Sequence, residues 1–172
     1  MIAALVCGQP DGKFFPGRSI VPIVGRPMMV YPLLAALHAQ QVQRVFLSTD
    51  APSMARIARH QGVTVLERTA ELSGEVPLEA ILADGHQRIE RESGEKPEAL
   101  VVLLCNAPTV TADMIDKAVE VLRSDTATDA VVSVSLHYEF SPRYALRLGG
   151  GNRLEPFLRQ APHDREVYFA DA

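Results

Sequence analysis

The feature that most constrains the fold of this chain is a set of short apolar runs without a polar face. Ile2–Val6 (IAALV) and Ala99–Leu104 (ALVVLL) are apolar at every position, and Gln43–Ser48 and Val63–Leu66 are further β-rich runs. A strand lacks a polar face only where both of its sides are buried, as in a parallel sheet covered by helices on both faces. The runs therefore predict the strands of such a sheet.

Segments with the spacing of amphipathic helices separate these runs. They are expected to begin at Pro27, Pro52, Pro77 and Ala112. Asp50 and Thr111 stand shortly before two of them and are candidate helix caps. Strand and helix thus alternate, which is typical of an α/β fold with a doubly wound, mostly parallel sheet. A 3-2-1-4 strand order would bring Cys7 and Cys105 to the ends of neighbouring strands.

The pattern changes towards the C-terminus, where no further helix is predicted. Ala130–Ser135 is expected to form one more strand, and short, partly antiparallel strands are expected at Tyr144–Leu148, Leu154–Phe157 and Val167–Ala170. At 172 residues, the chain is expected to form a single domain, residues 1–172. The last run has the pattern of a strand whose partner does not follow, so we expect the natural sequence to continue beyond Ala172.

Composition and charge exclude several classes of protein. The 17 Lys and Arg against 21 Asp and Glu give a net charge of -4, so no positive field is available to hold nucleic acid. No apolar run approaches the roughly 18 residues of a membrane span, and the first residues lack the basic flank of a signal peptide. Cys7 and Cys105 form no zinc motif and are expected to be reduced. These observations predict a cytoplasmic protein with no nucleic-acid or membrane partner.

The loop after the first strand, Cys7–Ser19, is the first candidate for a ligand site, because ligands of open α/β sheets bind beyond the carboxyl ends of the strands. Its glycines allow backbone amides to approach a ligand, and its cations can neutralise phosphate oxygens. The glycines are Gly8, Gly12 and Gly17, and the cations are Lys13 and Arg18. Neither GxxxxGK[ST] nor GxGxxG is present, so the pattern alone fits a plain surface loop equally well.

The N-terminal segment resembles a known signature. Ile2–Pro27 reads IAALVCGQPDGKFFPGRSIVPIVGRP, and it resembles the opening of the cytidylyltransferases that activate acidic sugars, of the acylneuraminate and 3-deoxy-manno-octulosonate type, which is approximately IAIIPARxGSKxxPxKNIxxxxGKP. Later segments resemble that family as well, namely LSTD from Leu47, ERTAEL from Glu67 and LLCNAPTVTADMIDKAVEVL from Leu103. The resemblance implies a Rossmann-like nucleotide-diphospho-sugar transferase architecture of the GT-A-like type. It also implies transfer of CMP from CTP to an acidic sugar, with release of pyrophosphate, by a homodimer.

The resemblance implies roles for individual residues. Lys13 and Arg18 would be the catalytic cations that offset charge on the β- and γ-phosphates. Backbone groups of Ala3 and Leu5 are expected near the base. The implied nucleotide site also includes Gly8, Gln9, Gly12, Ser19, Arg68, Cys105 and Asn106. Mg²⁺ would bridge the phosphates, and Asp171 is the candidate metal ligand late in the chain.

Several of these residues have a structural interpretation beside the functional one. Asp171 also fits a solvated residue near a terminus. Asp50 would orient ribose or metal, or cap the helix that follows it. Arg68 and Glu71 occupy positions of acceptor-side or base-side residues, but they also fit exposed loop charges, the interpretation that residue type favours.

This chain departs from the family pattern at the reactive positions. Gln9 replaces a loop Arg, Ser19 replaces an Asn, Cys105 replaces a Gln, and Asn106 stands in place of a metal-binding Asp. Two of these changes remove charge from the implied triphosphate and metal sites. Two alternatives therefore stay open beside the cytidylyltransferase. One is a related nucleotidyltransferase with another nucleotide or acceptor, and the other is a catalytically weak or inactive domain that serves as a binding or assembly module.

Overall fold

The computed structural model describes residues 1–9, 15–74, 76–136, 145–148, 150, 153–157 and 169–171. The chain divides into two compact units, residues 1–124 and 125–172. The first unit contains the large sheet and its helices, and the second contains short strands. The expectation that residues 1–172 form a single domain stays a prediction.

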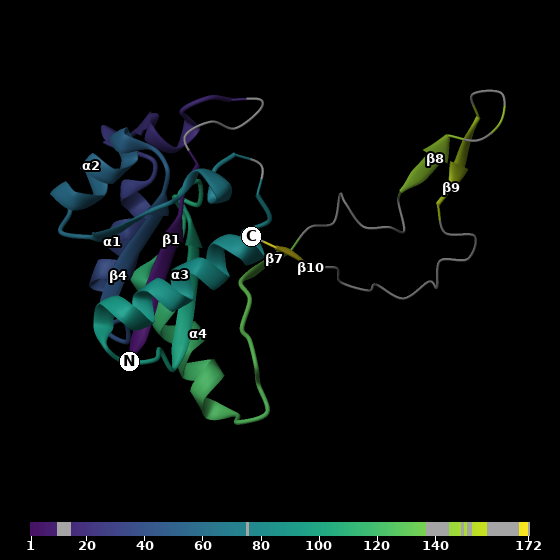
Figure 1. Ribbon diagram of the computed structural model, residues 1–172. Coiled ribbons are helices and arrows are strands. Elements are labelled where there is room, and N and C mark those ends of the chain that lie inside the picture. The colour runs from purple at the N-terminus through teal and green to yellow at the C-terminus, as the bar shows by residue number, and fades with distance from the viewer. Residues whose placement is uncertain are drawn as a thin grey trace. The chain divides into compact units, whose positions relative to one another are not determined.

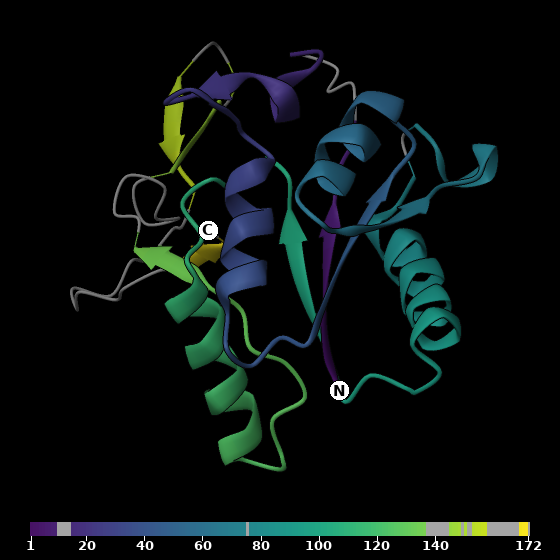
Figure 2. The same ribbon diagram turned by 90° about the vertical axis from the view of Figure 1, so that its left-hand side faces the viewer.

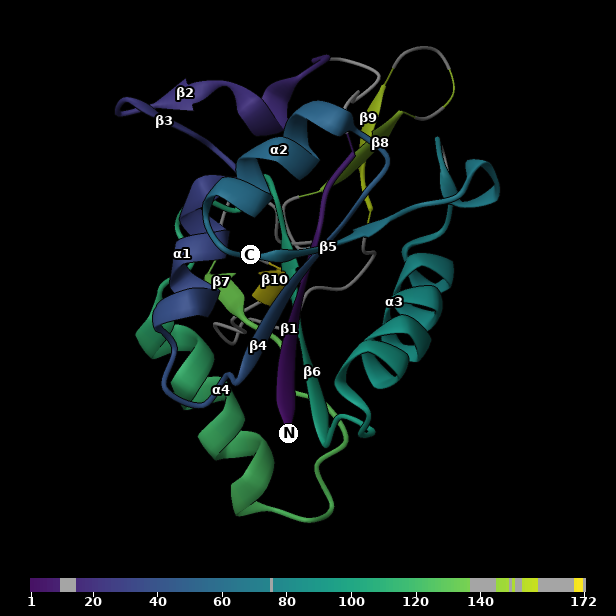
Figure 3. The same ribbon diagram turned by 60° about the vertical axis from the view of Figure 1, so that its left-hand side comes forward.

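A parallel four-stranded sheet forms the centre of the first unit. Its strands are β1 (Ile2–Cys7), β4 (Arg44–Thr49), β5 (Thr64–Glu67) and β6 (Ala99–Leu104). They lie in the order β5-β4-β1-β6, and every pairing is parallel (Figure 3). Cys7 is opposite Ser48 on β4 and Leu104 on β6. The predicted α/β class and the 3-2-1-4 order are confirmed.

Four helices cover the two faces of this sheet. They are α1 (Val30–His38), α2 (Pro52–His60), α3 (Leu78–Ser93) and α4 (Ala112–Ser124). Buried residues of α1, α2 and α4 share one core cluster with Ala4 and Val6, whereas α3 packs with Leu5 on the other face. Figures 1 and 2 show these helices around the sheet from two directions. α3 packs closely against β1 at Gly85, which has no side chain. A Cβ at this position would collide with Leu5 Cδ2.

One of the two predicted helix caps is confirmed. Thr111 Oγ1 accepts a hydrogen bond from the Met114 backbone amide at 3.3 Å, which satisfies a donor in the first turn of α4. The prediction for Asp50 as a cap is wrong: the residue before α2 is Ala51, and no side chain caps this helix. Pro52 already lacks the amide proton that would need a partner, and Asp50 lies one residue too early.

A short hairpin between β1 and α1 was not predicted. After the 3-10 helix η1 (Arg18–Ile20), β2 (Pro22–Ile23) and β3 (Arg26–Pro27) pair antiparallel. Gly25 has φ 79° and Val24 has φ 48°, a conformation that β-branched residues rarely adopt. A second 3-10 helix, η2 (Ala70–Leu72), follows β5.

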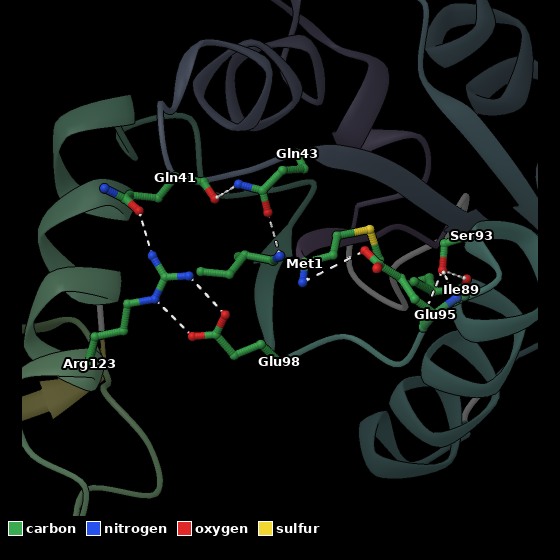
Figure 4. A network of polar contacts seen from close by, with 9 residues as sticks. Met1, Gln41, Gln43, Ile89, Ser93, Glu95, Glu98 and Arg123 are labelled. Atoms are coloured by element: carbon green, nitrogen blue, oxygen red, sulfur yellow. Dashed lines mark hydrogen bonds and ion pairs between the residues drawn. The ribbon is translucent and has the colours of Figure 1, made fainter.

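A network of polar contacts joins segments at the amino edge of the sheet (Figure 4). Arg123 at the end of α4 forms two hydrogen bonds with the Glu98 carboxylate, at 2.8 Å each, and a third with Gln41. The side chain of Gln43 in turn accepts from the Ile2 amide at 2.5 Å. Hydrogen bonding to Arg123 lowers the pKa of Glu98 below its ordinary value. The network thus connects α4 and the entry to β6 with the start of β1.

The described residues of the second unit form two antiparallel pairs. β7 (Val134–Leu136) pairs with β10 (Phe169–Asp171), and β8 (Leu146–Leu148) pairs with β9 (Leu154–Pro156). The prediction of short antiparallel strands near the C-terminus is confirmed for these residues, whereas Tyr144 and Val167 of the predicted ranges lie outside the described residues. The prediction that the last strand has no partner is wrong, because β10 pairs with β7. The predicted start of a strand at Ala130 is wrong: β7 begins at Val134, where the described pairing with Asp171 of β10 begins. None of the described helices is both long and apolar enough to span a membrane.

Candidate functional site

The carboxyl edge of the sheet brings most of the predicted site residues to one place. Neighbouring strands β4, β1 and β6 end at Thr49, Cys7 and Leu104. Past these ends the segments stay joined: the Gly8 amide donates to Ser48 O, and the Cys105 amide donates to Cys7 O, both at 3.0 Å. The loop that begins at Gly8 therefore starts beside the turn after β6.

Arg68 is buried at this edge. The residue is only 7% exposed, and its Nη2 donates to Gly8 O and, at 3.4 Å, to Ser48 O. The interpretation of Arg68 as an exposed loop charge is wrong, because its position directly after β5 turns the side chain under the ends of β4 and β1. Its Nη2 lies 3.8 Å from Asp50 Oδ1, so Asp50 is the ion partner of Arg68.

Gly8 has a packing role that the sequence did not indicate. A Cβ at this position would collide with Met54 Cε and lie 2.6 Å from Cys105 Sγ. Side chains of α2 and of the turn after β6 therefore occupy the space next to Gly8. A side chain at Gly8 would therefore force the buried side chains of Met54 and Cys105 to shift.

The structure describes both ends of the predicted phosphate loop. At its start, Gln9 is exposed, and its Nε2 donates to Gly74 O at 2.7 Å. At its end, Arg18 is exposed, whereas Ser19 is 4% exposed and its carbonyl accepts from the Met29 amide at 2.8 Å. Gly12 and Lys13 lie outside the described residues, and their roles stay predictions.

Ala3 and Leu5 are fully buried in the interior of β1. β1 is hydrogen-bonded to β4 on one side and to β6 on the other, so the backbone groups of both residues belong to the two ladders. Their proposed proximity to a base stays a prediction. Asn106 is exposed in the turn after β6, where its side chain faces solvent.

Both cysteines are free and buried, as predicted. Cys7 packs in the core cluster beneath α3, whereas Cys105 packs in the cluster of the opposite face. Burial raises the pKa of Cys7 to about 11, partly offset by Arg68, and raises the pKa of Cys105 to about 12. Both thiols are therefore neutral near pH 7, which makes them poor nucleophiles and poor metal ligands.

The described residues do not form a magnesium site by themselves. Among them, no group of three or more His, Cys, Asp and Glu side chains is placed to hold a metal ion. Mg²⁺ prefers carboxylate oxygens together with water and substrate phosphates. The Asp50 carboxylate faces Arg68, and Asn106 is neutral. The backbone of Asp171 pairs with Val134 in the second unit, and the structure does not describe its side chain.

Two surface cavities lie at other residues of the first unit. One, of about 380 Å³, is lined by Arg26, Pro27, Val30, Leu34 and Gln61. The other, of about 360 Å³, is lined by polar residues of α4 and the segment after α1. Neither includes a predicted site residue.

Comparison with known protein families assigns the chain to one of them. The family of the MobA-like NTP transferase domain matches residues 17–167. The chain belongs to this family. The match extends from the end of the loop after β1 into the second unit.

Curated relatives support the resemblance seen in the sequence. The 3-deoxy-manno-octulosonate cytidylyltransferase of Rhodopseudomonas palustris is 29% identical over 125 residues, which are 72% of this chain and 48% of that protein. A Helicobacter pylori protein described as pseudaminic acid cytidylyltransferase and UDP-2,4-diacetamido-2,4,6-trideoxy-beta-L-altropyranose hydrolase is 23% identical over 149 residues, 86% of this chain and 28% of that protein. The chain thus spans less than half the length of these relatives.

Solved structures share the fold. CMP:2-keto-3-deoxy-manno-octonic acid synthetase complexed with CTP matches with a TM-score of 0.62 at 19% identity, over 79% of this chain and 52% of that chain. A nucleotidyl transferase from Methanothermobacter thermautotroptrophicus matches with a TM-score of 0.59 at 17% identity, over 80% of this chain and 65% of that chain. The resemblance to acidic-sugar cytidylyltransferases and the Rossmann-like α/β fold are therefore confirmed.

Proposed function

We propose that this chain transfers CMP from CTP to an acidic sugar with release of pyrophosphate. The observation that supports this proposal most directly is the position of one segment. The segment that resembles the acidic-sugar cytidylyltransferases leaves β1 at the carboxyl edge of a parallel sheet, between the ends of β4 and β6. This edge is where open α/β sheets bind ligands. Family membership and the curated relatives support the same assignment.

In the proposed reaction, a sugar hydroxyl forms a bond to the α-phosphorus of CTP while the bond to the β-phosphate oxygen breaks. Lys13 and Arg18 offset the charge that develops on the departing pyrophosphate. The resemblance implies that backbone groups of Ala3 and Leu5 lie near the base, although the ladders of the sheet already engage them. Arg18 is exposed and therefore accessible to a phosphate.

The proposal includes further partners. Mg²⁺ accompanies CTP and is held chiefly by phosphate oxygens, because the described side chains supply no complete set of ligands. The reacting species are CTP and an acidic sugar, acted on by a cytoplasmic homodimer that engages neither nucleic acid nor membrane. A -4 net charge agrees with the exclusion of nucleic acid.

A second candidate function is a nucleotidyltransferase-like domain without chemistry, serving in binding or assembly. Two observations favour it: the side-chain amide of Gln9 already donates a hydrogen bond to Gly74 O, and the side chain of Asn106 is neutral. In this alternative the carboxyl edge retains the scaffold but supplies less positive charge to a triphosphate.

Calorimetric titration with CTP, ATP, GTP and UTP, each with and without Mg²⁺, distinguishes these functions. The proposed function predicts selective binding of CTP and a loss of roughly tenfold or more for Lys13→Ala, with a smaller loss for CMP, because one charge-assisted contact is removed. Lys96→Ala is the matched control, because Lys96 is exposed before β6 at the opposite edge of the sheet. Binding of no nucleotide at millimolar concentration would leave the assembly module as the better explanation.

Catalysis is tested separately by pyrophosphate release from CTP in the presence of acidic sugars.

Two substitutions test the phosphate site itself. Gln9→Arg and Asn106→Asp restore the charges found in the resembling family. The first is expected to tighten CTP binding, and the second to make it more dependent on Mg²⁺, each by roughly tenfold. If neither variant changes nucleotide affinity or its Mg²⁺ dependence, the loop after β1 is not a phosphate site.

A further inference from the structure

Two hydrogen bonds tie the start of the loop after β1 to the segment after β5. Arg68 Nη2 donates to Gly8 O, and Gln9 Nε2 donates to Gly74 O at 2.7 Å. In the first bond the donor belongs to the segment after β5, and in the second it belongs to the loop after β1. Consecutive residues of the loop, Gly8 and Gln9, are thus both bound to residues 68–74. The backbone of Arg68 is itself fixed, because its amide donates to Thr49 O at 2.9 Å.

The guanidinium of Arg68 suits this place for geometric reasons. It reaches the carbonyls of Gly8 and Ser48, which belong to neighbouring strand ends, and it has Asp50 as a counter-charge. All three contacts are made by one nitrogen, Nη2, whose place is fixed by the rigid guanidinium plane, whereas an ammonium group acts as a point charge on a flexible stem. The side chain is fully buried, and its Nε and Nη1 have no hydrogen-bond partner among the described residues.

Burying a cation is costly, and stability alone does not account for it. Apolar side chains of similar volume often replace buried ion pairs without loss of stability. What an apolar side chain cannot do is hold the carbonyl of Gly8, the residue from which the loop leaves the sheet. The chemistry of Arg68 therefore matches a role in fixing the direction of the chain at Gly8 and Gln9.

We infer that Arg68 is a positioning residue: it holds Gly8, with Gln9 as a second tie, and so sets where the loop with Lys13 and Arg18 leaves the sheet. The link to phosphate binding rests on the proposed function, but the holding of Gly8 and Gln9 does not. Arg68 acts through the backbone of the loop, because its guanidinium is covered by the protein.

Hydrogen exchange of the full chain tests the holding of the loop. In Arg68→Lys, the amide of Gly8, which donates to Ser48 O, is expected to exchange roughly tenfold faster than in the wild type, while the amides of α4 stay unchanged. Gln9→Ala, which alters only an exposed side chain, is expected to give a smaller acceleration at the same amide and covers the case in which Arg68→Lys does not fold. Arg59→Met is the control, because Arg59 forms only an exposed ion pair with Glu67. Unchanged exchange at Gly8 in both variants would overturn the inference.

Titration with CTP and CMP tests the link to phosphate. Displacing the loop is expected to lower the ratio of CTP to CMP affinity by roughly fivefold or more in Arg68→Lys, whereas a general loss of stability lowers both affinities equally. An unchanged ratio with accelerated exchange would overturn the link to phosphate binding. If the wild-type chain binds no nucleotide, the proposed function fails, and the exchange result still decides whether Arg68 positions the loop.

Discussion

Gly8→Ala separates two reasons for a glycine at the start of the loop. If Gly8 only gives a ligand access to the backbone, adding a methyl group leaves the free protein undisturbed. If Gly8 is required by packing, the methyl group strains the interior. The structure predicts the second outcome, because the new Cβ would collide with Met54 Cε and lie 2.6 Å from Cys105 Sγ.

The expected loss follows from two opposing effects. Inserting extra atoms into a packed interior costs about 1–3 kcal/mol. Replacing glycine by alanine gains about 0.4–1 kcal/mol through the unfolded state where the backbone is compatible. Gly8 is not among the residues with positive φ, so its backbone accepts alanine. The free energy of unfolding should therefore fall by about 1–2 kcal/mol, because the packing effect is the larger.

Urea unfolding of four variants measures this effect as a double-mutant cycle. Met54→Leu removes the terminal methyl that opposes Gly8, at a cost below about 1.5 kcal/mol. In that background, Gly8→Ala is expected to cost at least about 1 kcal/mol less than it does in the wild type. CTP titration of the double variant then shows whether regained stability is accompanied by nucleotide binding.

Two results would refute the packing argument. One is a Gly8→Ala variant within about 0.5 kcal/mol of the wild type, the usual effect of an unconstrained surface substitution. The other is additivity of the two substitutions, which would mean that Met54 is not the neighbour that resists the methyl group. Recovery of stability without recovery of CTP binding would instead assign Gly8 a separate role at the ligand.

Three further predictions concern local features. Val24→Gly is expected to raise the free energy of unfolding in urea by about 0.5–1 kcal/mol, because Val24 is 93% exposed at φ 48° and relief of about 1–2 kcal/mol of strain exceeds the cost of about 0.4–1 kcal/mol of a more flexible unfolded chain. Val121→Gly in α4 should lower it, and a destabilised Val24→Gly would contradict the strain at Val24. Thr111→Ala should cost about 0.5–2 kcal/mol through loss of the α4 cap, as measured by the same unfolding curves, and no change would mean that water replaces the hydroxyl. Burial raises the pKa values of Cys7 and Cys105 from 9.0 to about 11 and 12, so the thiols of the unfolded state ionise first and the free energy of unfolding falls as the pH rises above 9. Cys105→Ala should make this fall less steep in urea unfolding at several pH values. An equal slope in both proteins would exclude the Cys105 thiol as its cause.

The sequence predicted the sheet and its helices because their signals are local. Ala99–Leu104 coincides with β6 to the residue, but the expected burial on both faces is wrong for this strand: only Leu103 is buried, and Val102 and Leu104 are exposed. The hairpin of β2 and β3 was not predicted because its turn contradicts residue preference. Val24 stands where two-residue hairpin turns favour Asn or Gly, so no turn signal is present.

The candidate site was predicted only in part, because its contacts are distant in sequence. Arg68 and Gly8 are 60 residues apart, and Gln9 and Gly74 are 65 apart. Periodicity reports which face of an element is buried, but it does not report which side chain crosses to another strand end. The one usable signal was the place of Arg68 directly after β5, since residues that follow parallel strands gather at the carboxyl edge.

The two edges of the sheet are held together by different means, and the difference bears on function. At the amino edge, Arg123 and Glu98 join segments through exposed groups, which contribute little to stability and can exchange with water. At the carboxyl edge, a buried guanidinium performs the joining, although burial makes it more costly. Exposed pairs would suffice if connection were the only requirement. A buried donor adds a fixed direction for the carbonyl of Gly8, and the proposed function gives that direction a use, because in it the residues that follow would meet the phosphates of CTP.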